Sequence, residues 1–167
     1  MNRETTCCFT GPRSPRLPMN GNEYTAEIME LKEKLRAAVL SAYDDGFRFF
    51  MSGMAEGFDI FAAEAVLDLK EDYEDAVLVA VLPYSKALNN HSAKTKKRME
   101  EILSCSDFIY SITENHFTGC ELIRNKYMVD NSSRIIGYYN GLSSGTAHCW
   151  NYALEQGLET VNLYENI

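Results

Sequence analysis

The stretch FRFFMSGMAEGFDIFAAEAV, residues 47–66, decides the fold class. It opens with an apolar, aromatic run typical of a buried strand and passes through two glycines, Gly53 and Gly57. It ends in apolar residues at helical spacing. A strand that turns through glycine into a helix is the repeating unit of parallel α/β proteins. The stretch therefore predicts one such unit.

Five further apolar, β-branched or aromatic runs repeat the strand pattern. The five runs are TTCCFT at 5–10, AVLVAVLP at 76–83, DFIYSI at 107–112, RIIGYY at 134–139 and ETVNLY at 159–164. The strand part of the first stretch, FRFFMS at 47–52, is the sixth. The run at 76–83 is apolar at successive positions, as a parallel strand covered by helices on both faces requires. The sequence thus predicts about six strands.

Helical patterns lie between these runs. Apolar residues recur at three- and four-residue steps from Tyr24 to Ala42, from Phe58 to Leu69 and across 145–156. Because strand and helix alternate, we expect an α/β fold with a single Rossmann-like, doubly wound, mostly parallel sheet and helices on both faces. Residues 1–167 are interpreted as one domain, with segments 12–22 and 84–98 as two long polar loops.

Bulk composition narrows the classes of function. The net charge of −8 has the wrong sign for a protein that neutralises a phosphate backbone, so nucleic acid is an unlikely partner. A single nucleotide remains open, because a few backbone N–H groups and one or two arginines can hold it. The sequence has no apolar signal core and no run of about 20 apolar residues, so we expect a cytoplasmic protein without membrane attachment.

Two glycine-containing turns predict a phosphate site at the carboxyl ends of the strands. In the first turn, Ser52, Gly53 and Gly57 precede a helix, and Asp59 either caps that helix or meets a ribose hydroxyl. The second turn, GLSSGTAHCWNYA at 141–153, places hydroxyls and a glycine at a helix start, which suits a phosphate. Its candidate residues are Ser143, Ser144, Gly145 and Thr146. A capped helix start without a ligand explains either turn equally well.

Two further segments supply candidate charges. Gly11 and Arg13 end the first strand run, and an arginine there can grip phosphate with its forked donors, although a plain exposed basic loop is the alternative. Arg124, Asn125 and Asp130 form a polar set before the fifth strand run, and this local pattern by itself favours solvated surface over a binding site.

No metal site or disulfide framework is expected. The five cysteines form no CxxC pair, and their odd number does not suggest a set of bridges, so a reducing compartment fits. His91 and His116 are interpreted as surface residues without carboxylate or cysteine partners at ligand spacing. Adjacent His148 and Cys149 point about 100° apart on a helix and cannot act as a base and a thiol together.

The ordered set CCFTGPR, SGMAEGFDIFAAEAV, LPY, RNKYMVD and GLSSGTAHCWNYA resembles the SLOG superfamily of Rossmann-like nucleotide-associated proteins. Within it the likeness is greatest to the uncharacterised bacterial DUF1273, or YpsA-like, group, and it extends over about residues 5–164. The usual GHRP opening of that group reads GPRS here, so Arg13 is retained and Pro12 stands in the histidine position.

Two other SLOG branches help to interpret the motifs. Gly53, Ala55, Gly57 and Asp59 are similar to the GxAxGxD signature of DprA proteins, although Ala63 replaces a histidine frequent in that branch. Ser144, Gly145 and Thr146 are similar to the end of the PGGxGTxxE motif of LOG phosphoribohydrolases, with Cys149 at the catalytic glutamate position. A buried thiol cannot stabilise an oxocarbenium ion as a carboxylate does.

These resemblances imply binding more than turnover. We expect a sensor or binding protein for a nucleotide or ADP-ribose-like ligand, with no required cofactor. Arg13 and Arg124 would supply charge, and Asp59 or Asp130 would meet a ribose. The alternatives are a nucleotide N-glycosidase in which Asp59, Glu64 or Glu121 replaces the missing carboxylate, and a regulatory interaction protein such as a cell-division factor. Catalytic residues are unknown, and a homodimer is expected.

Overall fold

Six strands form one sheet in the computed structural model, which describes residues 1–164. They are β1 (Thr6–Thr10), β2 (Phe49–Ser52), β3 (Val77–Tyr84), β4 (Phe108–Thr113), β5 (Arg134–Gly137) and β6 (Glu159–Asn162). Their order across the sheet is β4-β3-β2-β1-β5-β6, and every pairing is parallel. The predicted sheet is therefore confirmed, and it is parallel throughout.

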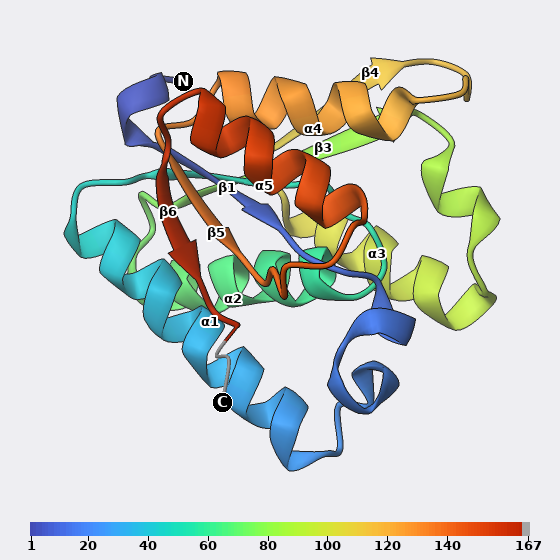
Figure 1. Cartoon of the computed structure of the whole chain (residues 1–167), viewed down its shortest axis with the longest axis horizontal. Helices are drawn as coiled ribbons and strands as arrows, with labels where there is room; N and C mark the ends of the chain where they lie inside the picture. The colour runs from blue at the N-terminus through green and yellow to red at the C-terminus, as the bar shows by residue number, and fades with distance from the viewer. Residues whose placement is uncertain (165–167) are drawn as a thin grey trace.

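Five α-helices cover the two faces of this sheet (Figure 1). They are α1 (Ala26–Asp44), α2 (Phe58–Asp72), α3 (Ala93–Cys105), α4 (Cys120–Asp130) and α5 (Gly145–Glu155). Helices α1, α2 and α3 pack together on one face, and α4 and α5 pack side by side on the other. A short 3-10 turn, η1 (Arg3–Thr5), precedes β1, and three more, η2 (Ser14–Arg16), η3 (Pro18–Gly21) and η4 (Ala87–Asn90), lie in the connections.

Strand β3 shows why the sheet needs both helical layers. Its side chains alternate between two hydrophobic clusters: Leu78, Ala80 and Leu82 belong to the cluster beneath α1 and α2, while Val79 and Val81 belong to the one beneath α4 and α5. Both sides are buried, so the apolar pattern of the sequence is continuous rather than alternating.

Two sequence interpretations of local structure need correction. Segment 84–98 is not one long loop, because η4 and the first turns of α3 occupy much of it. Within helix α3 only Met99 and Ile102 are buried. Two buried residues in a lysine-rich segment give too weak an apolar periodicity to predict a helix from the sequence. Tyr24 does not belong to the apolar face of α1 either, since it precedes the helix and is 91% exposed.

The sheet topology creates a crevice at one edge. The chain runs outward from β1 through β2, β3 and β4 and then returns to place β5 on the opposite side of β1. Connections leaving β1 and β5 therefore diverge to opposite faces, which opens space beyond the carboxyl ends of these strands.

Among residues 1–164, none of the helices has the length and apolarity needed to cross a membrane.

Candidate functional site

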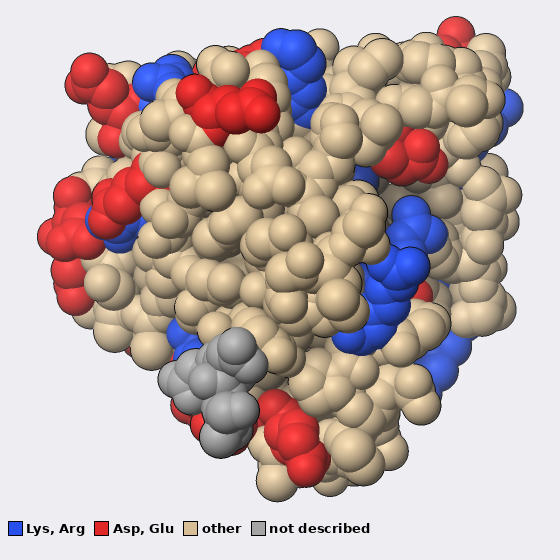
Figure 2. Space-filling model, viewed as in Figure 1, with Lys and Arg blue, Asp and Glu red and all other residues tan. Residues whose placement is uncertain are grey.

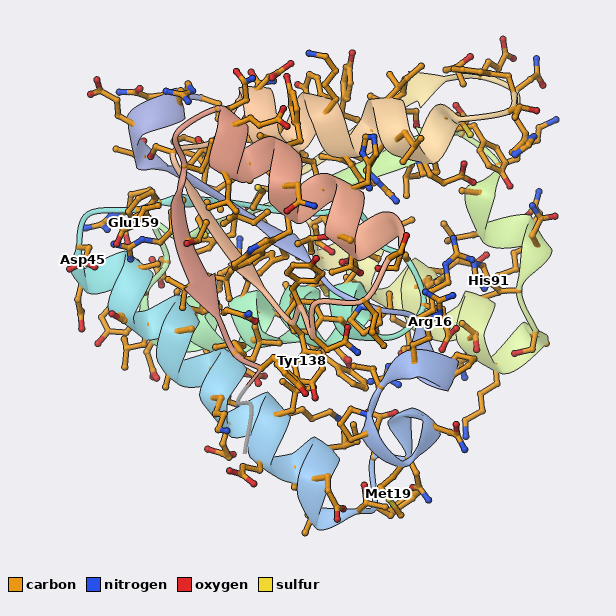
Figure 3. All side chains as sticks on the ribbon, in the orientation of Figure 1. Arg16, Met19, Asp45, His91, Tyr138 and Glu159 are labelled. Atoms are coloured by element: carbon orange, nitrogen blue, oxygen red, sulfur yellow. The ribbon has the colours of Figure 1, made fainter. Side chains whose placement is uncertain are left out.

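A cavity of about 480 Å³ lies at this crevice, and we call it the main cavity. Figure 2 shows basic atoms gathered beside a hollow on this side of the molecule, in the area where Figure 3 labels Arg16. The lining comes from the end of β1 and its following loop, from the start of α2, and from α4 and α5. The polar or glycine lining residues are Thr10, Gly11, Arg13, Arg16, Asp59, Glu121, Arg124, Asn125, Ser144, Gly145 and Thr146.

The connection between β2 and α2 is folded tightly beneath the main cavity. The Ser52 hydroxyl donates to the Asp59 carbonyl at 2.8 Å and accepts from the Met54 N–H at 3.2 Å. Gly57 has a φ of +100°, and a Cβ there would lie 2.8 Å from the Pro12 carbonyl oxygen. The glycine thus permits both the turn and the close approach of the loop after β1.

Arg124 is a buried cation on the floor of the site. Its side chain is held by the carbonyl oxygens of Gly53 and Val81, the latter 3.4 Å from Nη1, and Nε donates to Asn125 Oδ1 at 2.7 Å. A Cβ on Gly53 would lie 2.8 Å from the Arg124 Cζ atom. Glycine at this position therefore leaves the space that the guanidinium fills, and the interpretation of Arg124 as solvated surface is wrong.

Asp59 lies beside this guanidinium at the start of α2 and is 6% exposed. Its carboxylate accepts from the Ala55 N–H at 3.3 Å. Burial raises the pKa of Asp59 to about 6, although Arg124, the Ala55 N–H and Arg13 all favour the charged form. A carboxyl group with this pKa can exchange a proton near neutral pH.

Arg13 and Arg16 stand on the exposed loop above this floor. Arg16 Nη1 donates to the Ser143 carbonyl at 3.4 Å. Within residues 1–164 the Arg13 side chain forms no hydrogen bond or ion pair, so its donors are available to an anion. The two arginines and Arg124 outnumber the carboxylates of Asp59 and Glu121 in the lining, so the main cavity has an excess of basic groups in an acidic protein.

The N-terminus of α5 completes the site. Ser144 is its N-cap, and its Oγ accepts from the Ala147 N–H at 3.1 Å. Thr146 is buried in the first turn, while a Cβ on Gly145 would meet nothing within 4 Å. A helix N-terminus presents unpaired N–H groups and a partial positive charge, and both attract phosphate.

Most of the predicted site residues converge here. Gly11, Arg13, Asp59, Arg124, Asn125, Ser144, Gly145 and Thr146 line the main cavity. Gly53 lines an adjoining cavity of about 180 Å³, and Ser143 one of about 390 Å³. Ser52 and Gly57 lie beneath the surface as supports for the β2–α2 connection rather than as lining residues.

Asp130 is not brought to the site. It occupies the far end of α4, where its carboxylate accepts from Lys126 Nζ at 2.8 Å and from the Tyr152 hydroxyl at 2.6 Å. Asp59 therefore stays as the single predicted ribose partner.

Another polar cluster lies at the opposite ends of the strands, where Arg134 bridges Asp45 and Glu159, which Figure 3 labels close together.

The three carboxylates suggested for an N-glycosidase are placed differently. Glu121 and Asp59 line the main cavity, but Glu64 is ion-paired with Arg98 away from it. Cys149, at the position of the LOG glutamate, is 1% exposed, and burial raises the pKa of its thiol to about 11. The thiol is thus neutral at physiological pH.

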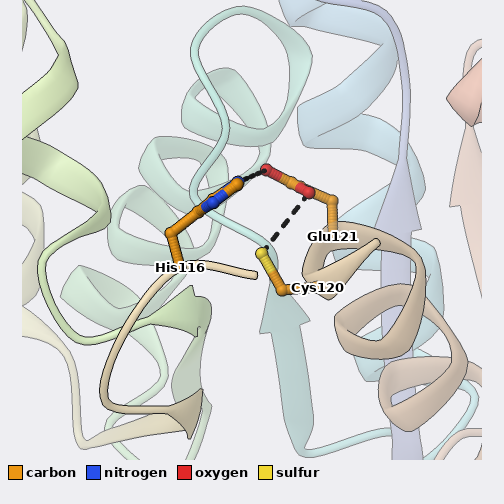
Figure 4. A group of neighbouring side chains, drawn as sticks. All are labelled: His116, Cys120 and Glu121. Atoms are coloured by element: carbon orange, nitrogen blue, oxygen red, sulfur yellow. Dashed lines mark hydrogen bonds and ion pairs between the residues drawn. The ribbon is translucent and has the colours of Figure 1, made fainter. Parts of the chain in front are cut away.

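The prediction that His116 has no carboxylate or cysteine partner is wrong. Its Nε2 lies 4.0 Å from Glu121 Oε1, and Cys120 Sγ donates to Glu121 Oε2 at 3.5 Å (Figure 4). The three ligand atoms lie within 4.8 Å of one another. The spacing HxxxCE, folded back by Gly119 in a left-handed conformation, is the sequence signal that was missed.

Strand β4 lies at the edge of the sheet (Figure 1) and carries exposed apolar side chains. Phe108, Ile109 and Tyr110 are 60%, 53% and 44% exposed. Exposed apolar side chains on a strand edge are typical of interaction surfaces. Both the homodimer and the regulatory protein partner considered above fit this patch.

Two bacterial proteins illustrate the similarity to curated sequences. The chain is 29% identical to the SPbeta prophage-derived protein YoqJ of Bacillus subtilis over 140 residues, or 75% of this chain and 81% of that one. It is 25% identical to a UPF0398 protein of Halalkalibacterium halodurans over 115 residues, or 68% of this chain. That match spans 61% of the relative, so the relative is considerably longer than the shared segment.

Solved structures of DNA processing protein A, DprA, share the fold. The protein from Helicobacter pylori aligns with a TM-score of 0.68 and 20% identity over 99% of this chain and 67% of that chain. The protein from Streptococcus pneumoniae aligns with a TM-score of 0.65 and 15% identity over 98% of this chain and 52% of that chain. The chain therefore corresponds to part of the longer DprA proteins.

These neighbours correct the expectation about nucleic acids. The H. pylori structure is described as having a single-stranded DNA binding mode, so nucleic acid cannot be called an unlikely partner of this fold on charge alone. Net charge is a poor guide here because phosphate contacts depend on the local arrangement of basic groups rather than on the charge summed over the whole surface.

A family model matches nearly the whole chain. The family model named YpsA, described as the YspA SLOG family, matches residues 7–164, a range that runs from β1 to beyond β6 and includes both cavity-forming turns. This chain belongs to the YspA SLOG family.

Proposed function

We propose that this protein binds a nucleotide or a nucleotide-derived phosphate compound in the main cavity, in the cytoplasm. The observation that carries the proposal is the convergence of Arg13, Arg16 and Arg124 on the N-terminus of α5. Three guanidinium groups and a helix N-terminus around about 480 Å³ favour a compact anion with a body attached to it.

Each part of such a ligand has a suitable partner. Phosphate oxygens would accept from Arg13 and from the N–H groups at Gly145 and Thr146. The Asp59 carboxylate would accept from a ribose hydroxyl at the inner end of the cavity. Arg124 is held by backbone carbonyls, so it would provide charge from a fixed position.

The test is a thermal-shift screen against AMP, ADP, ATP, NAD, ADP-ribose and cyclic nucleotides, followed by isothermal titration calorimetry. We expect at least one compound to raise the melting temperature. Arg13→Ala should then weaken its binding by about 1.5–3 kcal/mol, or about 10- to 150-fold, because a charged hydrogen-bonding group is lost. Arg36→Ala, which removes a surface arginine of α1, is the control and should leave affinity unchanged.

Two results would contradict the proposal. The first is the absence of a thermal shift with every compound. The second is equal affinity of Arg13→Ala and the unmodified protein, which would remove Arg13 from the site. A single-stranded oligonucleotide belongs in the same titration, since a DprA neighbour is described with such a ligand.

A second candidate function is hydrolysis of the N-glycosidic bond of a nucleotide. The observation that favours it is the presence of two carboxylates, Asp59 and Glu121, on one cavity, with the Asp59 pKa at about 6. Two such groups can divide acid and base roles. Chromatography of each incubated sample separates the functions: intact ligand supports binding alone, whereas free base released by the unmodified protein and not by Glu121→Gln supports hydrolysis.

A further inference from the structure

We propose that His116, Cys120 and Glu121 form a binding site for a divalent transition metal with the ligand preferences of zinc, at the rim of the main cavity. The site requires no nucleotide, so it stands independently of the function proposed above. Figure 4 shows the three side chains directed toward one another from the loop before α4 and from its first turn.

The donor set suits this class of metal. An imidazole nitrogen, a thiolate and a carboxylate oxygen are the three protein ligand types that zinc takes, and the thiolate disfavours magnesium and calcium. On binding, the Cys120 thiol gives its proton to solvent, and the thiolate and the Glu121 carboxylate then balance the two positive charges of the ion.

The distances are close to those of a loaded site. Metal–ligand bonds of about 2.0–2.3 Å at tetrahedral angles put ligand atoms roughly 3.3–3.7 Å apart. The Cys120 Sγ–Glu121 Oε2 distance is 3.5 Å, and the His116 Nε2 atom lies 4.0 Å from the other carboxylate oxygen, Glu121 Oε1. No pair exceeds 4.8 Å, so a contraction of roughly 1–1.5 Å in the longest pair completes the geometry.

The backbone and a neighbouring ring hold this arrangement. The Cys120 N–H donates to the Phe117 carbonyl at 3.1 Å, and Gly119 takes a φ of +88°, which folds the loop back on the helix. The His116 ring makes an edge contact with Tyr84 at a centroid distance of 5.2 Å. Cys120 is fully buried at the start of α4, whereas the side chains of His116 and Glu121 are 56% and 38% exposed, so these two have the space to move onto an ion.

The surroundings leave room for a fourth ligand. The cavity of about 180 Å³ beside the main cavity is lined by His116, Glu121 and Arg124. Three protein ligands with one position open to water or to a bound molecule is the arrangement of reactive zinc sites, whereas structural sites are closed by four protein ligands. Arg124 would repel the ion, but Asp59 lies beside that guanidinium and offsets its charge.

Cobalt(II) is the probe for this site, because a cobalt–thiolate bond produces a charge-transfer absorption band in the near ultraviolet. We expect one equivalent of Co²⁺ to produce the band and Zn²⁺ to abolish it. Cys120→Ser should remove the band, and His116→Ala and Glu121→Gln should each weaken Co²⁺ binding by at least about tenfold. The controls are Cys105→Ser, at an exposed cysteine, and His91→Ala, which should both retain it.

Several outcomes would overturn the site. They are the absence of the band in the unmodified protein, its persistence in Cys120→Ser, and its loss in Cys105→Ser. Should Cys120→Ser fail to fold because the thiol is buried, the exposed His116→Ala variant decides: Co²⁺ affinity within twofold of the unmodified protein refutes the proposal. Nucleotide titrations play no part in these readouts, so failure here leaves the proposed function standing.

Discussion

Replacement of Asp59 by asparagine should make folding stability less dependent on pH. The folded-state pKa of about 6 lies above the ordinary value of 3.8, so between these values the folded protein binds more protons than the unfolded chain. The free energy of unfolding therefore falls as pH rises through this window. A tenfold change in proton affinity corresponds to about 1.4 kcal/mol, so the charged Asp59 costs the fold about 3 kcal/mol at pH 7.

Asparagine has the shape of the protonated carboxyl group and cannot ionise. The free energy of unfolding of Asp59→Asn minus that of the unmodified protein should therefore increase by about 2.4 kcal/mol between pH 4 and pH 7, since the rest of the change lies below pH 4. Urea unfolding followed by the fluorescence of Trp150, the single tryptophan, measures it at each pH. Taking the difference at each pH removes the titration of groups common to both proteins.

Asp68→Asn is the matched control, since Asp68 lies on the same helix with a side chain 56% exposed. Its stability difference from the unmodified protein should vary by less than about 1 kcal/mol over this range. A constant difference for Asp59→Asn, within about 0.5 kcal/mol from pH 4 to pH 7, would refute the argument that burial rather than the neighbouring arginine dominates the titration of Asp59.

Three other substitutions test the supports of the site. Gly53→Ala should lower the free energy of unfolding, measured in urea, by about 1–3 kcal/mol, because its Cβ would lie 2.8 Å from Arg124 Nη1. It should also lower nucleotide affinity, since Arg124 would be displaced. Unchanged stability would show that the guanidinium moves freely. Ser144→Ala should cost about 1 kcal/mol of stability through loss of the N-cap of α5, and no loss would exclude that cap. Arg98 lowers the pKa of Glu23 to about 2. At neutral pH the free energy of unfolding of Glu23→Gln should therefore be about 1–2 kcal/mol lower than that of the unmodified protein, after allowance for solvent screening. That loss should disappear as pH falls from about 4.5 toward 2, and a loss independent of pH would contradict it.

The fold could be predicted because its signals are local. The two-sided apolar pattern at 76–83 requires a covered parallel strand, and β3 occupies Val77–Tyr84. The glycine-rich turn at 53–57 predicted the entry to α2, which begins at Phe58. Helix α3 was missed because two buried side chains in 13 residues give little periodicity.

The candidate site was predictable in its positions but not in its contacts. Glycines and hydroxyls at strand ends indicated where a ligand could approach, since topology gathers those ends. The burial of the Arg124 side chain depends on Gly53, which is 71 residues away in the sequence. A local sequence pattern cannot predict a contact between residues so far apart. The same holds for Asp130, whose position on a helix end directs it to α5 rather than to the cavity.

The attachment of the loop after β1 has a consequence for the thermodynamics of recognition. The Phe58 N–H donates to the Pro12 carbonyl at 3.2 Å, and the Ser14 hydroxyl bonds to the Glu56 carboxylate, so the backbone around Arg13 is fastened to the start of α2 at two points. The loop is thus preorganised before a ligand arrives. The ordering entropy of binding is then confined to the Arg13 and Arg16 side chains, at about 0.5–1.5 kcal/mol each. Binding would then require no ordering of the loop backbone, and the free and bound backbones should superimpose closely.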